Sequence, residues 1–320
     1  MADGPSSRSR LAPPKGGHTE AERSWDAIWE SHRASFEEYV EGIYFSAEPR
    51  LAGLVEAMRY SMLGGGKRVR PTLCMEAARV FGADPARVLP AAAAVELIHT
   101  YSLIHDDLPA MDDDDYRRGR LTTHRRYGEA LAILSGDAFF GEAMMLITAE
   151  QEGGPEERLA AVHALAAATG VDGMVGGQVI DMENTGSGPG ADPETLSLIH
   201  RFKTGALIRA SARIGAVLAG AEDGPLEAVC EYADELGLCF QIVDDLLNAT
   251  ATPEELGKSA GSDAEKAKAT FVGVYGLEGA RREADAALAR ALGALEKAFP
   301  DDGETGGLRD LALFVRNRGS

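Results

Sequence analysis

Apolar residues recur three and four positions apart along most of the chain, a spacing that places them on one face of an α-helix. Ala, Leu and Glu, which favour helices, are abundant, and no run of alternating β-branched residues stands out. Asp84-Pro85 and Asp192-Pro193 each place a capping side chain before a proline at the first helical position. The pattern predicts an all-α fold. The expected helices cover about 24–46, 49–63, 70–82, 85–107, 128–150, 155–184, 192–220, 225–249, 276–298 and 305–317.

The chain shows one change of composition along its length. Residues 1–22 are rich in Pro, Ser and Gly with scattered basic residues, which is typical of a disordered N-terminal tail. Nothing like a linker divides residues 23–320, so the sequence predicts a single all-α domain there.

The charge balance excludes some partners. Lys and Arg number 32 and Asp and Glu 51, for a net charge of −19, whereas nucleic-acid phosphates select basic surfaces. We therefore expect no nucleic-acid partner, and any phosphate must be bound locally. The longest apolar stretch, 88–104, is interrupted by Glu96 and His99, so no membrane span is expected. The three cysteines lack metal-binding spacing and are typical of reduced, buried residues in a cytoplasmic protein.

An acidic segment follows one of the apolar stretches. Six aspartates lie within residues 106–115, and Arg117-Arg118 come directly after them. Such charge is stable when something cancels it, and Mg²⁺ is held by a few carboxylates together with substrate phosphates. The arginines can bind phosphate oxygens in a bidentate manner. A solvated acidic loop is the alternative, and this segment alone supports both. We expect the helix to end near Asp107 and a loop to carry Asp112 back toward it.

A second acidic pair echoes the first. Ser-Leu-Ile-His-Asp-Asp-Leu at 102–108 recurs loosely as Phe-Gln-Ile-Val-Asp-Asp-Leu at 240–246. Gln241, Asp245 and Asn248 share one helix face, with Asp244 beside them and apolar residues around. A carboxylate pair in such surroundings needs a partner. Two helices that end in paired aspartates could face one another across a cavity and share metals.

Basic residues form a second group of candidates. Gly64-Gly65-Gly66 leads through Lys67 into a predicted helix with Arg70 at its start, an arrangement that suits a diphosphate. The alternative is a glycine turn with solvated basic residues. Lys203 lies in an otherwise apolar helix, where a lysine needs a partner or an anion. A lone lysine or histidine is more often structural.

Two further signals are positional. Gln178 and Asp181 are one turn apart beside Gly176-Gly177, a sign of close backbone approach. His99 stands one turn before Ser102 and two turns before Asp106.

Together these motifs, in this order, resemble the trans-polyprenyl diphosphate synthases, specifically the short-chain bacterial farnesyl and geranylgeranyl diphosphate synthases. The resemblance covers roughly residues 24–318. Asp106-Asp107 with Asp112 is similar to the first aspartate-rich motif in its longer bacterial form, and Asp244-Asp245 with Asn248 to the second. The family usually has a third aspartate where Asn248 stands, and asparagine is an uncharged oxygen ligand. The resemblance implies an isoprenoid-synthase-type helical bundle around a central cavity, a homodimer and Mg²⁺ dependence.

The resemblance also implies roles by matching position. The metal ligands, for three Mg²⁺ ions, would be Asp106, Asp107, Asp112 and Asp244. The allylic diphosphate would be held by Arg117, Lys203, Gln241, Lys258 and Lys268. The isopentenyl diphosphate would be held by Lys67, Arg70, His99 and Arg118. Supporting positions would be Asp107, Gln178, Asp181, Asp245 and Asn248. Asp106, Asp107, Lys203, Asp244 and Lys258 would carry the chemistry.

The product and the activity leave alternatives. Tyr101 lies five residues before Asp106, about 7.5 Å deeper along an ideal helix, and with Ser102 it would form a floor beneath the growing chain. By resemblance this favours the C15 product, farnesyl diphosphate, with the C20 product as the alternative. A class I terpene cyclase would have no use for the Gly65-Gly66-Lys67 site. A non-catalytic subunit of a hetero-oligomeric synthase is favoured by Asn248 alone.

Overall fold

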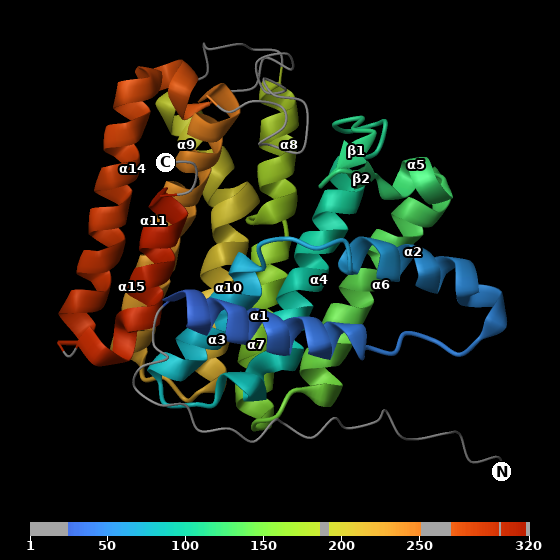
Figure 1. The fold of residues 1–320 in the computed structure, drawn as a ribbon, viewed down its shortest axis with the longest axis horizontal. Helices are drawn as coiled ribbons and strands as arrows, with labels where there is room; N and C mark the ends of the chain where they lie inside the picture. Colours follow the sequence, from blue (N-terminus) through green and yellow to red (C-terminus); the bar gives the residue numbers. More distant parts are fainter. Residues whose placement is uncertain (1–24, 186–191, 251–269, 301, 318–320) are drawn as a thin grey trace.

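The computed structural model describes residues 25–185, 192–250, 270–300 and 302–317. Within these ranges helices dominate and one small hairpin occurs (Figure 1). The elements are α1 (Trp25–Glu41), η2 (Pro49–Leu51), α2 (Ala52–Met62), α3 (Val69–Val80), η3 (Pro85–Val88), α4 (Leu89–Asp106), β1 (Tyr116–Arg117), β2 (Arg120–Leu121), α5 (Thr123–Tyr127), α6 (Glu129–Met145), η4 (Leu146–Glu150), α7 (Pro155–Thr169), α8 (Met174–Asn184), α9 (Pro193–Ile199), η6 (His200–Gly205), α10 (Ala206–Leu218), α11 (Asp223–Thr250), α14 (Phe271–Ala298) and α15 (Asp302–Asn317). The all-α prediction is confirmed.

The helices pack around two apolar clusters. One cluster is built on α4 and α6, and the other on α11, α14 and α15. α10 joins them, because Leu207 and Ile214 belong to the first cluster and Ile208 and Ala212 to the second. α3 and α4 are buried along most of their length, which explains why their sequences are apolar on nearly every side.

Two long predicted helices are interrupted. The expected helix 155–184 is two helices, α7 and α8, separated at Gly170–Gly173. A Cβ at Gly173 would lie 2.3 Å from the Ala168 carbonyl oxygen, so only glycine allows this turn. The expected helix 192–220 contains the π-helical segment η6, which carries Lys203. Single π-helical turns of this kind are frequent at functional sites.

The hairpin β1–β2 and the short helix α5 are absent from the sequence prediction. The pairs Tyr116–Leu121 and Arg117–Arg120 face each other across the hairpin. Its two turn residues, Arg118 and Gly119, have φ of 53° and 72°, as the tight turn of a two-residue hairpin requires. Strands of two residues are too short to show an alternating pattern, so the helical period around them hid the hairpin.

Three helical stretches are long and apolar enough to cross a membrane by length and composition: Pro85–Asp106, Glu129–Glu150 and Pro155–Asn184. This corrects the sequence-based expectation that no segment qualifies, because Glu96 and His99 do not lower the mean hydropathy of the first stretch enough. In the fold 67% of the apolar window of that stretch is buried, against 39% and 33% for the other two.

Candidate active site

The first aspartate-rich motif turns back on its own helix. α4 ends at Asp106, and the amide of Asp112 donates to the carbonyl oxygen of Asp106 at 2.8 Å. The amides of Met111 and Asp113 both donate to the Leu108 carbonyl oxygen, which closes the loop. The expected return of Asp112 toward Asp106 is confirmed for the backbone. Two carboxylates six residues apart are thereby brought to one helix end.

Asp107, next in the chain, is directed elsewhere. Its Oδ1 accepts from Nε of Arg117 at 2.8 Å and lies 2.6 Å from Nη2 of the same arginine. Burial raises the pKa of the Asp107 carboxyl group, and Arg117 opposes that shift. Both residues line a cleft between α2, α4 and the hairpin, together with Thr100 and Tyr60. Asp107 thus anchors the hairpin, which corresponds to the supporting role that the resemblance implies.

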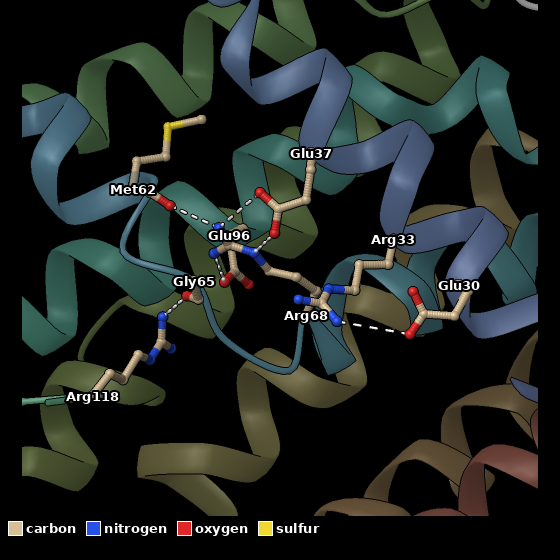
Figure 2. Close-up of polar contacts among 8 residues, drawn as sticks. All are labelled: Glu30, Arg33, Glu37, Met62, Gly65, Arg68, Glu96 and Arg118. Atoms are coloured by element: carbon tan, nitrogen blue, oxygen red, sulfur yellow. Dashed lines mark hydrogen bonds and ion pairs between the residues drawn. The ribbon is translucent and has the colours of Figure 1, made fainter. Parts of the chain in front are cut away.

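Arg118 reaches the glycine turn. Its guanidinium donates to the Gly65 carbonyl oxygen and covers Gly66 (Figure 2). A Cβ at Gly66, where φ is 135°, would lie 2.6 Å from Nη1 of Arg118, so a side chain there would displace the guanidinium. The two neighbouring arginines of the hairpin therefore contact different elements: Arg117 binds the end of α4, and Arg118 binds the loop before α3.

Cations converge around His99. Burial lowers the pKa of the imidazole well below its ordinary value, and the positive charges of Arg70, Arg118 and Arg117 lower it further. The pKa of Arg70 falls to about 10, mainly through burial and also through Arg118, while Glu96 and Asp244 oppose the shift. Arg70, His99 and Arg118, three of the four residues expected to hold one diphosphate, are thus gathered. Lys67 is exposed on the turn that leads to Arg70.

Lys203 has the partner that the sequence demanded. Its Nζ donates to Oδ2 of Asp181 at 2.6 Å, which joins η6 to α8. A Cβ at Gly177 would lie 2.2 Å from the Lys203 amide nitrogen, so the predicted close approach at this glycine is confirmed. Beside them, Oε1 of Gln178 is buried and lacks a hydrogen-bond partner within the described part of the chain. The Lys203–Asp181 ion pair holds the Lys203 ammonium group in place, where it can bind an anion.

The second aspartate pair divides its tasks. Asp245 is buried, and its Oδ2 accepts from the Phe271 amide at 2.7 Å, which ties α11 to the first turn of α14. Asp244 lies close enough to Arg70 to affect its pKa. Oε1 of Gln241 lies 3.2 Å from Nδ1 of His200, so α11 is also joined to η6. Asp244 is the carboxylate of this pair that neighbours the cation cluster.

Tyr101 and Ser102 precede Asp106 on α4 by five and four residues, just over one helical turn deeper along the helix. The Tyr101 ring meets the His105 ring edge to face, with centroids 5.0 Å apart, and packs against the first apolar cluster. Burial, Asp106 and Asp137 raise the pKa of its hydroxyl. The Ser102 hydroxyl donates to the His99 carbonyl oxygen at 2.8 Å.

Two predicted site residues lie outside the described part of the chain, and three residues near the site were not predicted from the sequence. Lys258 and Lys268 fall outside the described residues. Sequence analysis gave no role to Arg68, Glu37 or Glu96. Glu96 carried a usable signal, because a charge within an otherwise apolar, buried helix requires a partner.

The donor set suits a hard cation. Asp106, Asp112 and Asp244 offer carboxylate oxygens without neighbouring thiol ligands, the chemistry that Mg²⁺ prefers. In the described ranges no three Asp, Glu, His or Cys side chains converge into a ready-made metal cage.

The chain matches a known protein family over most of its length. The family model described as polyprenyl synthetase matches residues 52–302. The chain belongs to the polyprenyl synthetase family. This confirms the resemblance inferred from the motifs and makes the chain a prenyltransferase with the all-α fold of that family.

Individual polyprenyl synthetases are similar over most of their length. The farnesyl diphosphate synthase of Geobacillus stearothermophilus is 46% identical over 72% of this chain and 78% of its own. The geranylgeranyl diphosphate synthase of Cyanophora paradoxa is 42% identical over 83% of this chain and 87% of its own. The crystal structure of a geranyltransferase from Helicobacter pylori, complexed with magnesium and isoprenyl diphosphate, has a TM-score of 0.80 and 28% identity, covering 95% of this chain and 99% of that one.

Proposed function

We propose that this polyprenyl synthetase condenses isopentenyl diphosphate head to tail with an allylic diphosphate, dimethylallyl or geranyl, and that its main product is farnesyl diphosphate. One observation supports this most strongly. The cations form two groups, one around His99 on α4 and one at Lys203 on η6, with Asp106 at the end of α4 and Asp244 on α11 close enough to Arg70 to affect its pKa. Two anionic substrates need two such groups.

Each group has a separate task. Lys203, Arg117 and Gln241, with Lys258 and Lys268, hold the allylic diphosphate and its departing pyrophosphate. Lys67, Arg70, His99 and Arg118 hold the isopentenyl diphosphate with its double bond toward the allylic carbon. Because burial, reinforced by the neighbouring arginines, lowers the pKa of His99 well below its ordinary value, its neutral imidazole can hydrogen-bond the diphosphate without adding a charge that must be desolvated.

The reaction needs no protein nucleophile. The allylic carbon–oxygen bond breaks, the isopentenyl double bond forms the new carbon–carbon bond, and the departing pyrophosphate accepts the proton lost from the isopentenyl unit. Asp106, Asp107, Asp112 and Asp244 would hold the Mg²⁺ ions, whose positive charge would offset the repulsion between these carboxylates and the allylic diphosphate, and Asp107 also pairs with Arg117. Bound Mg²⁺, three ions in the full complex, would stabilise the charge on the leaving pyrophosphate.

Other residues keep the substrate-binding side chains and their helices in position. Asp181 fixes Lys203, and Asp245 fixes α11 against α14. Gln178 offers a buried amide oxygen beside Lys203, and Asn248 gives the second motif an uncharged oxygen where a third aspartate is usual. We expect weaker binding of one metal ion from Asn248, with the site still active.

The length of the product is set at Tyr101. Its ring lies one turn and more below Asp106, against the apolar cluster, and Ser102 is beside it. A chain growing from Asp106 along α4 would meet this ring. That favours the C15 product, and geranylgeranyl diphosphate is the alternative if the ring moves aside.

The assembly proposed is a homodimer of single-domain chains. α6 exposes Ile133, Leu134, Phe140 and Met145, an apolar stripe at helical spacing that a second copy would cover. Cys74, Cys230 and Cys239 are buried within the fold, as reduced cysteines of a cytoplasmic protein commonly are.

The test is a product assay. Purified protein is incubated with Mg²⁺, labelled isopentenyl diphosphate and dimethylallyl, geranyl or farnesyl diphosphate in turn. We expect a linear C15 diphosphate from the first two allylic substrates. A cyclic hydrocarbon would instead identify a cyclase, and no turnover without another protein would identify a subunit. The presence of two cation groups argues against a cyclase, because a cyclase binds one diphosphate and needs only one such group.

A further inference from the structure

Arg68 is the last residue of the segment that leads from the glycine turn into α3, and its guanidinium contacts residues of α1, α2 and α4. Its backbone is left-handed, with φ of 49° and ψ of 35°, at the residue that precedes α3. L-residues other than glycine adopt this conformation rarely. The guanidinium is almost completely buried, with 1% of the side chain exposed, so it cannot contact a diphosphate itself.

The guanidinium is held from three helices (Figure 2). Nε donates to Oε1 of Glu37 at 2.8 Å and Nη2 to Oε2 of Glu37 at 3.2 Å, which is a bidentate contact to α1. Nη1 donates to Oε1 of Glu96 on α4 at 2.7 Å. Nη2 also donates to the Met62 carbonyl oxygen, the last residue of α2, at 2.8 Å. We call these residues the Arg68 clamp.

The clamp joins the elements that carry the cation group around His99. Lys67 is the residue before Arg68, and Arg70 is two residues after it. Glu96 is one turn before His99 on α4. The clamp therefore fixes the turn against α4 at the level of His99, and Arg118 then rests on Gly65 and Gly66 of the same turn.

Charge supports the same arrangement. Arg68 brings one positive charge and the two glutamates bring two negative ones. Glu96 raises the pKa of both Arg70 and Arg118, and so opposes the repulsion between cations held close together. A hydrophobic replacement of Arg68 would leave both glutamate carboxylates without the positive charge that balances them.

We propose that Arg68, held by Glu37 and Glu96, is a positioning residue that sets the spacing of Lys67, Arg70 and Arg118 for the isopentenyl diphosphate. This rests on the proposed function, because that function supplies the second diphosphate. It assigns Arg68 no contact with either substrate. It also explains why the turn carries an arginine at a backbone conformation that glycine would adopt more easily.

The test separates the two substrates. Arg68→Lys keeps the charge but loses the bidentate fork. We expect its KM for isopentenyl diphosphate to rise about tenfold, because charge-assisted hydrogen bonds are lost and cations at a site must be held within a fraction of an ångström. Its KM for the allylic diphosphate should stay within twofold, and its kcat should fall less than the isopentenyl KM rises.

Arg79→Lys is the matched control. Arg79 lies on the same helix, α3; its Nε donates to both carboxylate oxygens of buried Glu76, and its Nη2 donates to the Glu304 carbonyl oxygen. Both KM values should stay unchanged in this variant. Glu37→Gln is a milder second variant if Arg68→Lys does not fold, and it should raise only the isopentenyl KM.

The outcomes are distinguishable. Equal rises of both KM values in the clamp variants, or the same behaviour as Arg79→Lys, would overturn the positioning role while the proposed function stands. If the unsubstituted protein makes no elongated product, the proposed function fails first and the positioning role fails with it. A selective rise in the isopentenyl KM supports the proposal.

Discussion

The amide of Asp112 donates to the carbonyl oxygen of Asp106 at 2.8 Å, so the first aspartate-rich motif is a loop folded onto its own helix end. This bond joins residues six apart in sequence and brings a loop residue back to the end of α4. The carboxylate of Asp107, between them, points instead to Arg117. Function in this motif therefore depends on the loop as much as on the helix.

Asp112→Asn should lower turnover about 10²-fold and raise the Mg²⁺ concentration needed for half-maximal activity, because a charged oxygen ligand is lost while the backbone bond remains. Steady-state rates across a Mg²⁺ series would measure both effects. Asp113→Asn is the control, since Asp113 has φ of 53°, which asparagine tolerates. Similar rates for the two variants would remove Asp112 from the metal site.

Tyr101→Ala should lengthen the product beyond C15, because removal of the ring opens depth along α4 below Asp106. Chromatography of the dephosphorylated products would detect the shift. Tyr44→Ala is a control at a half-exposed tyrosine in the segment after α1. An unchanged product distribution in Tyr101→Ala would show that the floor lies elsewhere.

His99 should make the protein less stable in acid. Its pKa is lowered in the folded state, so below pH 6.5 the unfolded chain binds a proton that the folded chain does not. Stability from this group is complete above pH 6.5 and is lost at about 1.4 kcal/mol per pH unit as the pH falls toward the folded pKa. Urea unfolding of the wild type and His99→Gln should show their difference shrinking over that range. Parallel curves between pH 7.5 and 5 would contradict the prediction.

Asp245→Ala should lower the free energy of unfolding by about 2 kcal/mol, since a buried, charge-assisted bond to the Phe271 amide is lost at the start of α14. Asp245→Asn should lower it less, because an amide oxygen still accepts. Chemical denaturation would measure both. If Asp245→Ala were as stable as the wild type, the link between α11 and α14 would contribute nothing.

Phe140→Glu should convert a dimer to a monomer, because it places a charge in the exposed apolar stripe of α6. Light scattering during size-exclusion chromatography would give the mass. Leu313→Glu is the matched control, since Leu313 is exposed to a similar degree on α15. A dimer that persists in Phe140→Glu would place the interface elsewhere.

Several features of the site could be predicted because they are local. The sequence predicted that the helix ends near Asp107, since proline follows at position 109, and it raised the expectation that a loop carries Asp112 back. Lys203 needed a partner because its neighbours are apolar, and that partner, Asp181, had already been singled out on its own helix. The prediction failed at 116–121, where strands of two residues depend on contacts that no periodicity records.

Sequence by itself determined the helical class, the family and the candidate site residues, because hydrophobic spacing and motif order are properties of neighbouring residues. Tertiary structure decided which of those candidates bind other protein groups. Asp107 is bound to Arg117, Asp245 to Phe271 and Arg68 to Glu37 and Glu96. The two residues of each pair lie on different helices or on a helix and the hairpin. Only the packing of these elements determines which carboxylates bind other protein groups.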